Sequence, residues 1–154
     1  MAYEIAKWLH VLSSTVLFGT GLGSAYYMFF ASLTRNPATI AHVVRYVVIA
    51  DWLFTTTTII FQPLSGFYLA YLVHYPLTSR WIVWSIVLYF VAGACWIPVV
   101  LIQIRMRRLA EAAAREGAAL PAAYTRLFRW WTALGVPAFV SLVIVFYLMV
   151  AKPV

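Results

Sequence analysis

Four long apolar segments, separated by short polar stretches, dominate the pattern of hydrophobic and polar positions along the chain. We place these segments at about residues 3–33, 45–73, 81–104 and 130–150. A helix needs about 20 mostly apolar residues to cross a bilayer, so each segment is long enough. We therefore predict an all-α integral membrane protein, a four-helix bundle that forms a single transmembrane domain over residues 1–154.

Turn-forming residues indicate where these helices begin, bend and end. Asn36 followed by Pro37 favours a helix start. A helix from Pro37 to Val73 is longer than the roughly 30 Å of hydrocarbon requires, so its first turns should lie in the headgroup region. Pro63 should kink this helix and leave the carbonyl of Ile59 without its usual partner. Beyond the third span the helix should continue to Gly117, a typical C-cap, as a cytoplasmic helical extension between the third and fourth spans.

Composition supports the membrane assignment and excludes several kinds of function. Charged residues make up 10% of the chain, against about 25% in soluble domains. The net charge of +7 comes from residues at the borders of the spans, so we expect no nucleic-acid partner. The single cysteine, Cys95, cannot form an internal disulfide. The sequence contains no nucleophile elbow or glycine-rich phosphate loop, so hydrolase or kinase chemistry is not supported.

Arginine residues are concentrated on one side of the predicted bundle. The opposite side carries only Lys7, Arg80 and Lys152. Basic residues mark the cytoplasmic side of membrane proteins, so we expect both termini outside the cell, in the inner membrane of a bacterium. The joint between the third and fourth spans contains Arg105, Arg107, Arg108, Arg115, Arg126 and Arg129.

A polar stripe runs along the second span. Asp51, Thr55, Thr58 and Gln62 fall within roughly 60° of one another on a helix that advances 100° per residue. An ionisable group inside a span is costly and usually faces a bundle interior, so Asp51 is a candidate proton site. Its alternatives are a structural ion pair with an arginine or a hydrogen bond with the Thr55 hydroxyl. Arg45 is interpreted as a phosphate-facing anchor.

Histidines suggest a cofactor site near the outer surface. A low-spin haem b needs two axial ligands across a bundle, and His10 and His74 are the only histidine pair on one side, whereas His42 lies on the other. We therefore predict cofactor binding by His10, Gln62 and His74, with His10 on the haem iron. The alternatives are a hydrogen bond of His10 with Ser14 or Gln62, and an interfacial role for His74.

Tryptophans and glycines indicate how the helices meet lipid and one another. Gly19 and Gly23 fit the small-xxx-small pattern of packed membrane helices, so we expect a homo-oligomer or a membrane partner. Interfacial belts facing the lipid bilayer are predicted at Trp81, Trp84, Trp130 and Trp131.

Several segments resemble a bacterial family of predicted integral membrane proteins of unknown function. They are WLHVLSSTVLFGTGLGSA, RYVVIADWLFT, QPLSGFYL, CWIPVVLIQIRM and LMVAKP, which together cover essentially the whole chain. More distantly, the Leu-His of the first span and the final Lys-Pro resemble the HemJ-type membrane protoporphyrinogen oxidase. That resemblance implies haem b, porphyrinogen oxidation coupled to respiration, His10 as an axial ligand and Lys152 as the terminal lysine. The family's further histidine is missing here, since the third and fourth spans contain none.

Three functional hypotheses follow from these residues. The first is a small redox-associated membrane protein that binds haem b or a quinone-like ligand near His10, Asp51 and Gln62. The second is a non-catalytic membrane subunit whose small-residue faces bind a partner. The third is a proton-linked carrier of small solutes, for which four spans would have to dimerise to form a pathway.

Overall fold

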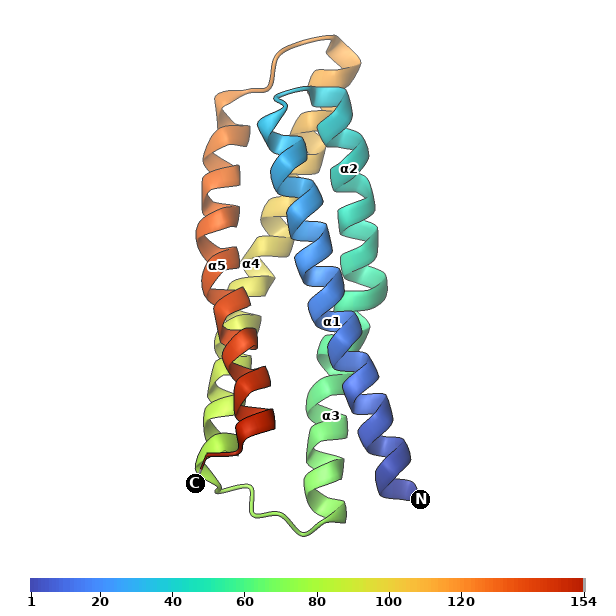
Figure 1. Ribbon diagram of the computed structural model, residues 1–154. Helices are drawn as coiled ribbons and strands as arrows, with labels where there is room; N and C mark the ends of the chain where they lie inside the picture. Colours follow the sequence, from blue (N-terminus) through green and yellow to red (C-terminus); the bar gives the residue numbers. More distant parts are fainter. Residues whose placement is uncertain (154) are drawn as a thin grey trace.

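The computed structural model describes residues 1–153 and shows a bundle of four helical rods (Figure 1). Val154, the last residue of the predicted domain, lies outside the described part. All four rods are long and apolar enough to cross a membrane, which confirms the predicted all-α membrane bundle. The elements are α1 (Ala2–Leu33), α2 (Pro37–Ala50), the π-helical turn η1 (Asp51–Thr55), α3 (Thr56–Leu72), α4 (Arg80–Glu116) and α5 (Ala122–Ala151).

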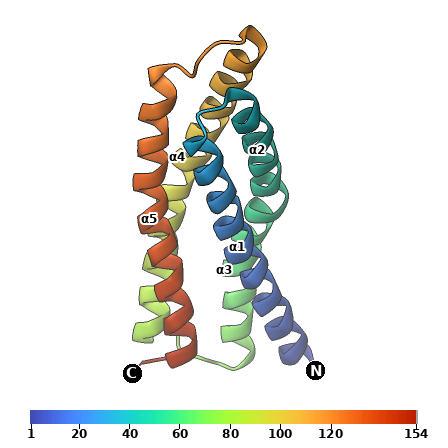
Figure 2. The same ribbon diagram turned by 45° about the horizontal axis from the view of Figure 1, so that its top comes forward.

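Helices α2, η1 and α3 follow one another without a break and form one rod. Successive rods of the bundle run in opposite directions (Figures 1 and 2). Both chain termini and the loop of residues 73–79 lie at one end, which we call the terminal end. The loops of residues 34–36 and 117–121 lie at the other end, which we call the arginine-rich end.

The predicted helix boundaries at the arginine-rich end are confirmed. The side chain of Asn36 caps α2 and accepts a hydrogen bond from the backbone nitrogen of Thr39 at 3.1 Å. Gly117 ends α4 with a φ of 61°, a left-handed conformation that glycine adopts without strain. Because α4 is unbroken up to Glu116, the predicted helical extension is part of the same helix as the third span.

Helix packing is uneven along the bundle. Helices α4 and α5 pack along each other, α2 packs against α4, and α1 packs against α2 and α3. In contrast, α1 and α5 contact each other at only a few positions. The bundle is therefore held together mainly through α2 and α4, and a seam is left between α1 and α5.

The apolar core lies toward the arginine-rich end. Met28, Ile40, Val44 and Met106 have no exposed surface and belong to one cluster from α1, α2 and α4. Tyr124 of α5 joins this cluster, and its hydroxyl forms a hydrogen bond of 2.8 Å with the Ser32 hydroxyl of α1. These contacts connect all four rods at this end and hold the helices that form the site described below.

Candidate functional site: a cavity beside Asp51

The predicted polar stripe is buried in the bundle. Asp51, Thr55, Thr58 and Gln62 are each less than 10% exposed, and Ser65 extends the stripe by one further residue. Thr58 donates its hydroxyl hydrogen to the carbonyl of Phe54, four residues before it, at 2.6 Å. The stripe thus lies inside the protein, as a membrane location requires of such groups.

The Thr55 hydroxyl is the partner of Asp51. Thr55 Oγ1 donates to Asp51 Oδ1 at 3.0 Å, and the side chain of Gln103 on α4 faces the same carboxyl group. Arg45 is exposed, and none of the ion pairs within residues 1–153 involves Asp51. Of the alternatives considered for Asp51, the structure therefore supports the hydrogen bond with Thr55 and not an ion pair with arginine.

The stripe begins at the π-helical turn η1, which spans Asp51–Thr55. The carbonyl of Asp51 accepts hydrogen bonds from both the backbone nitrogen and the hydroxyl of Thr56, the latter at 2.9 Å. Single π-turns inside α-helices are rare and occur frequently at functional sites. The turn places a widened stretch of helix at the one buried carboxyl group of the second rod.

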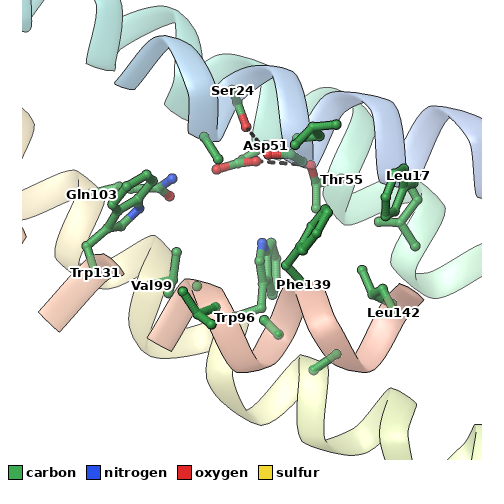
Figure 3. Close-up of a pocket in the computed structure, with 18 of the residues that line it drawn as sticks. Leu17, Ser24, Asp51, Thr55, Trp96, Val99, Gln103, Trp131, Phe139 and Leu142 are labelled. Atoms are coloured by element: carbon green, nitrogen blue, oxygen red, sulfur yellow. Dashed lines mark hydrogen bonds between the residues drawn. The ribbon is translucent and has the colours of Figure 1, made fainter. Parts of the chain in front are cut away.

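A cavity of about 450 Å³ lies beside this turn (Figure 3). It is bounded by α1, the second rod, α4 and α5, and its volume lies in the range of sites for small molecules, about 300–1,000 Å³. The walls are mostly apolar and aromatic, with Leu17, Phe18, Trp96, Val99, Phe139 and Leu142 among the lining residues. The polar residues of the wall include Ser24, Asp51, Thr55 and Gln103.

The cavity adjoins the seam between α1 and α5. Leu22 and Tyr26 of α1 and Val136 of α5 line it and are 49%, 57% and 58% exposed. These side chains lie on apolar helix surfaces long enough to span a membrane, so their exposed faces would contact lipid chains. The cavity therefore borders an exposed, apolar part of the bundle surface.

Two buried polar atoms in the cavity wall lack a hydrogen-bond partner. They are Oε1 of Gln103, an acceptor, and Nε1 of Trp131, a donor. Gln103 is 3% exposed and Trp131 is 6% exposed, and Figure 3 shows both toward the same end of the cavity. An unpaired buried polar group costs about 1–3 kcal/mol, so such groups are rare in folded proteins.

The position of Trp131 corrects a prediction made from the sequence. Trp130 and Trp131 were both assigned to an interfacial belt, but Trp130 is 59% exposed and Trp131 is buried in the cavity wall. Adjacent residues of a helix point about 100° apart, so one of two neighbouring tryptophans turns inward when the other faces lipid. The seven-residue spacing from buried Tyr124 would have identified the inward one.

Tyr89 of α4 connects the cavity wall with α3. It lines the cavity, and its hydroxyl donates a hydrogen bond to the carbonyl of Ile59. Pro63 has no backbone N–H to offer this carbonyl, which confirms the prediction that Ile59 would lack its helical partner. The carbonyl that Pro63 leaves free in α3 is thus hydrogen-bonded by a side chain of α4.

His10 and Gln62 meet at the contact between α1 and α3, nearer the terminal end. Nε2 of Gln62 donates to the backbone carbonyl of His10 at 3.0 Å. Nδ1 of His10 lies 2.7 Å from Oγ of Ser65, which also lies 2.8 Å from the carbonyl oxygen of Phe61. The ring nitrogen and the serine hydroxyl thus share one hydrogen bond, and its direction depends on the tautomer of His10.

His74 lies apart from this contact. It is exposed after the end of α3, with a φ of 52°, and its ring stacks near Tyr71 with 6.4 Å between ring centroids. Neither His74 nor His10 lines the cavity beside Asp51. The residues present thus offer one partly buried imidazole but not two that face each other, as a bis-histidine haem needs. Lys152, the terminal lysine of the resemblance, lies over the Trp81 ring.

Comparison with known proteins identifies the family of the chain. Residues 4–153 match the family model described as "Predicted integral membrane protein (DUF2269)". The chain belongs to this family. No curated protein and no solved structure matches it. For this DUF2269 protein the family assignment confirms an integral membrane protein, and the cavity, the π-turn and the two unpaired atoms are the features from which a function can be argued.

Proposed function

We propose that this protein is a membrane-embedded binding protein for a lipophilic small molecule of the quinone class. The observation that supports the proposal is the cavity of about 450 Å³ beside Asp51, with apolar walls and a small polar region. Such a combination suits a ligand with an apolar body and a compact polar head. This places the ligand nearer to Asp51 than to His10, the other residue considered from the sequence.

The opening of the cavity determines how a ligand would enter. Because α1 and α5 barely touch, and because Leu22 and Val136 at the seam are exposed, an apolar molecule could enter from the lipid. A quinone with an alkyl tail partitions into the hydrocarbon, so it is already concentrated at this opening. Its tail could remain between the helices while its ring occupies the aromatic part of the cavity near Trp96 and Phe139.

Two glycines of α1 offer a matched test. Gly21 lines the cavity and Gly23 does not, and an added Cβ meets no atom within 4 Å at either position. Gly21→Leu should therefore fill part of the cavity, whereas Gly23→Leu should leave it open. We expect saturable binding of a decyl-substituted benzoquinone to the purified protein, at least about tenfold weaker in Gly21→Leu and unchanged in Gly23→Leu.

Binding can be followed by the quenching of tryptophan fluorescence, since Trp96 and Trp131 line the cavity. Calorimetric titration in the same detergent provides an independent measurement. Quenching that rises linearly with the quinone in the micelle, without saturation, would contradict the proposal. Equal loss of binding in both leucine variants would show that the quinone binds elsewhere.

Haem b held by His10 is a second candidate, favoured by one specific observation. His10 contacts Ser65 through Nδ1, and ligating histidines commonly hydrogen-bond through one ring nitrogen while the other, here Nε2, holds the metal. A Soret absorption band in protein from haem-replete cells, lost in His10→Ala and retained in His42→Ala, would support it. A colourless and fully folded preparation would exclude it.

The orientation in the membrane is part of the proposal. The arginine-rich end would face the cytoplasm and the terminal end the outside of a bacterial inner membrane, in line with the positive-inside rule. Labelling of a cysteine introduced at Ser79, in the loop of residues 73–79, with a membrane-impermeant reagent in intact cells tests this. Labelling only after the membrane is opened would reverse the orientation.

A further inference from the structure

The unpaired atoms of the cavity wall indicate the chemistry of the ligand's polar head. Resting on the proposed function, we propose that the site selects a head that carries a hydroxyl group, such as a hydroquinone, over a head with carbonyl or ether oxygens only. The selection comes from Gln103 and Trp131, which offer an acceptor and a donor without partners inside the protein.

The acceptor side of the site is formed by Gln103 and Asp51. The Gln103 side chain faces the Asp51 carboxyl group, and because its Oε1 has no partner, the amide nitrogen is the atom directed to this group. Oε1 of Gln103 is therefore free to accept a hydrogen bond from a ligand. Thr55 already donates to Oδ1 of Asp51. A ligand placed here therefore meets one oxygen atom, Oε1 of Gln103, that needs a donor.

The donor side of the site is the indole of Trp131. Its Nε1–H is buried and has no acceptor within the described residues 1–153, although most buried indole N–H groups have one. The ring also stacks against Phe128, with 6.0 Å between ring centroids, which holds the indole in place. A ligand oxygen that accepts from this N–H would satisfy it.

A hydroxyl group is the smallest group that can satisfy both sides. Its hydrogen can be donated to Oε1 of Gln103 or to the carboxyl group of Asp51, and its oxygen can accept from Nε1 of Trp131. A carbonyl or ether oxygen could accept from Trp131, but it would leave Oε1 of Gln103 unpaired. It would also place a second acceptor beside the Asp51 carboxyl group. Sites with buried polar groups discriminate strongly against ligands that leave such groups unpaired.

The cleanest test compares two ligands that differ only in the hydroxyl hydrogen. The probes are para-nonylphenol and its methyl ether, which have the same ring and tail and undergo no redox chemistry during the titration. We expect the phenol to bind the wild-type protein at least about tenfold more tightly than the ether, in calorimetric titrations in detergent. A decyl-substituted hydroquinone and its benzoquinone should show the same order.

Variants of the two side chains locate the selection. Gln103→Met keeps the size of the side chain and removes the acceptor, so the preference for the phenol should fall to about threefold or less. Trp131→Phe removes the donor and should weaken the binding of both probes. Ser85→Ala on the same helix as Gln103 is the control, since Ser85 is also a buried polar residue but does not line the cavity. It should keep the wild-type preference.

The possible outcomes separate this inference from the proposed function. If both probes bind saturably and with equal affinity, the proposed binding of a lipophilic molecule stands, but the proposed selection of a hydroxyl group by Gln103 is wrong. A preference that persists in Gln103→Met would also overturn it. If neither probe binds saturably, the proposed function itself fails. Should Gln103→Met not fold, the comparison of the two probes on the wild-type protein still decides between equal and unequal affinity.

Discussion

The two halves of the bundle are filled in different ways. Toward the arginine-rich end, Met28, Ile40 and Met106 form an apolar interior without exposed surface, contributed by three helices. Toward the terminal end, the second rod buries polar side chains, such as Thr58 and Gln62, against α1. The space between the rods at η1 is a cavity and not a core.

This difference shows how a small membrane bundle can combine stability with an open site. Tight apolar packing at one end holds all four rods, so the other part of the bundle does not need to be filled. There the helices associate as pairs, α1 with α3 and α4 with α5. Hydrogen bonds across the interior, such as that between Tyr89 and the Ile59 carbonyl, connect the pairs at single points. The predictions below test this division, beginning with the largest effect.

Removal of a side chain from the apolar core should have the largest effect on stability. Met106 is fully buried, and Met106→Ala should lower the free energy of unfolding by about 2–5 kcal/mol because it leaves a cavity. Unfolding in mixed micelles of mild detergent and dodecyl sulfate measures this. Leu101→Ala on the same helix, where the side chain is 57% exposed, should cost about 0.5 kcal/mol or less. Equal costs would contradict the assignment of the core to this end.

Loss of the hydrogen bond between α4 and α3 should have an intermediate effect. Tyr89→Phe leaves the Ile59 carbonyl without a donor, and should cost about 1–3 kcal/mol in the same unfolding measurement. In the background of Pro63→Ala, residue 63 regains a backbone N–H that can reach this carbonyl. The cost of Tyr89→Phe should then fall by about 1 kcal/mol. An unchanged cost would show that the loss in Tyr89→Phe does not come from the unpaired Ile59 carbonyl.

Features that depend on one helix could be predicted from the sequence. The cap at Asn36, the end of α4 at Gly117 and the freed Ile59 carbonyl follow from the local chemistry of single residues. The common face of Asp51 and Thr55 follows from helical periodicity, which the short π-turn changes too little to separate them. Such rules need no knowledge of how the helices pack.

Features that depend on the packing of helices could not be predicted in this way. Nothing in the local sequence marks Gln103 as part of the site, because its position beside Asp51 requires α4 to pack against the second rod. The cavity exists because α1 and α5 hardly meet, which no periodicity of either helix shows. The π-turn is another such feature, since the residues of Asp51–Thr55 also fit an ordinary α-helix.

The smallest effect is expected for the hydrogen bond between Thr55 and Asp51. Thr55→Val keeps the shape of the side chain and removes the donor to Oδ1, so it should cost about 1 kcal/mol of unfolding free energy. Thr57→Val is the matched control on the same rod, since Thr57 is exposed and donates only to backbone carbonyls of its own rod. It should change stability by about 0.5 kcal/mol at most.

Ligand binding gives this last comparison a second measurement. In Thr55→Val the Asp51 carboxyl group loses a donor inside the protein, so a ligand hydroxyl becomes more important to it. The preference for para-nonylphenol over its methyl ether should therefore increase in Thr55→Val and stay at the wild-type value in Thr57→Val. A decrease in Thr55→Val would mean that the threonine itself holds the ligand. In that case Thr55, and not Gln103, would be the residue that binds the ligand hydroxyl.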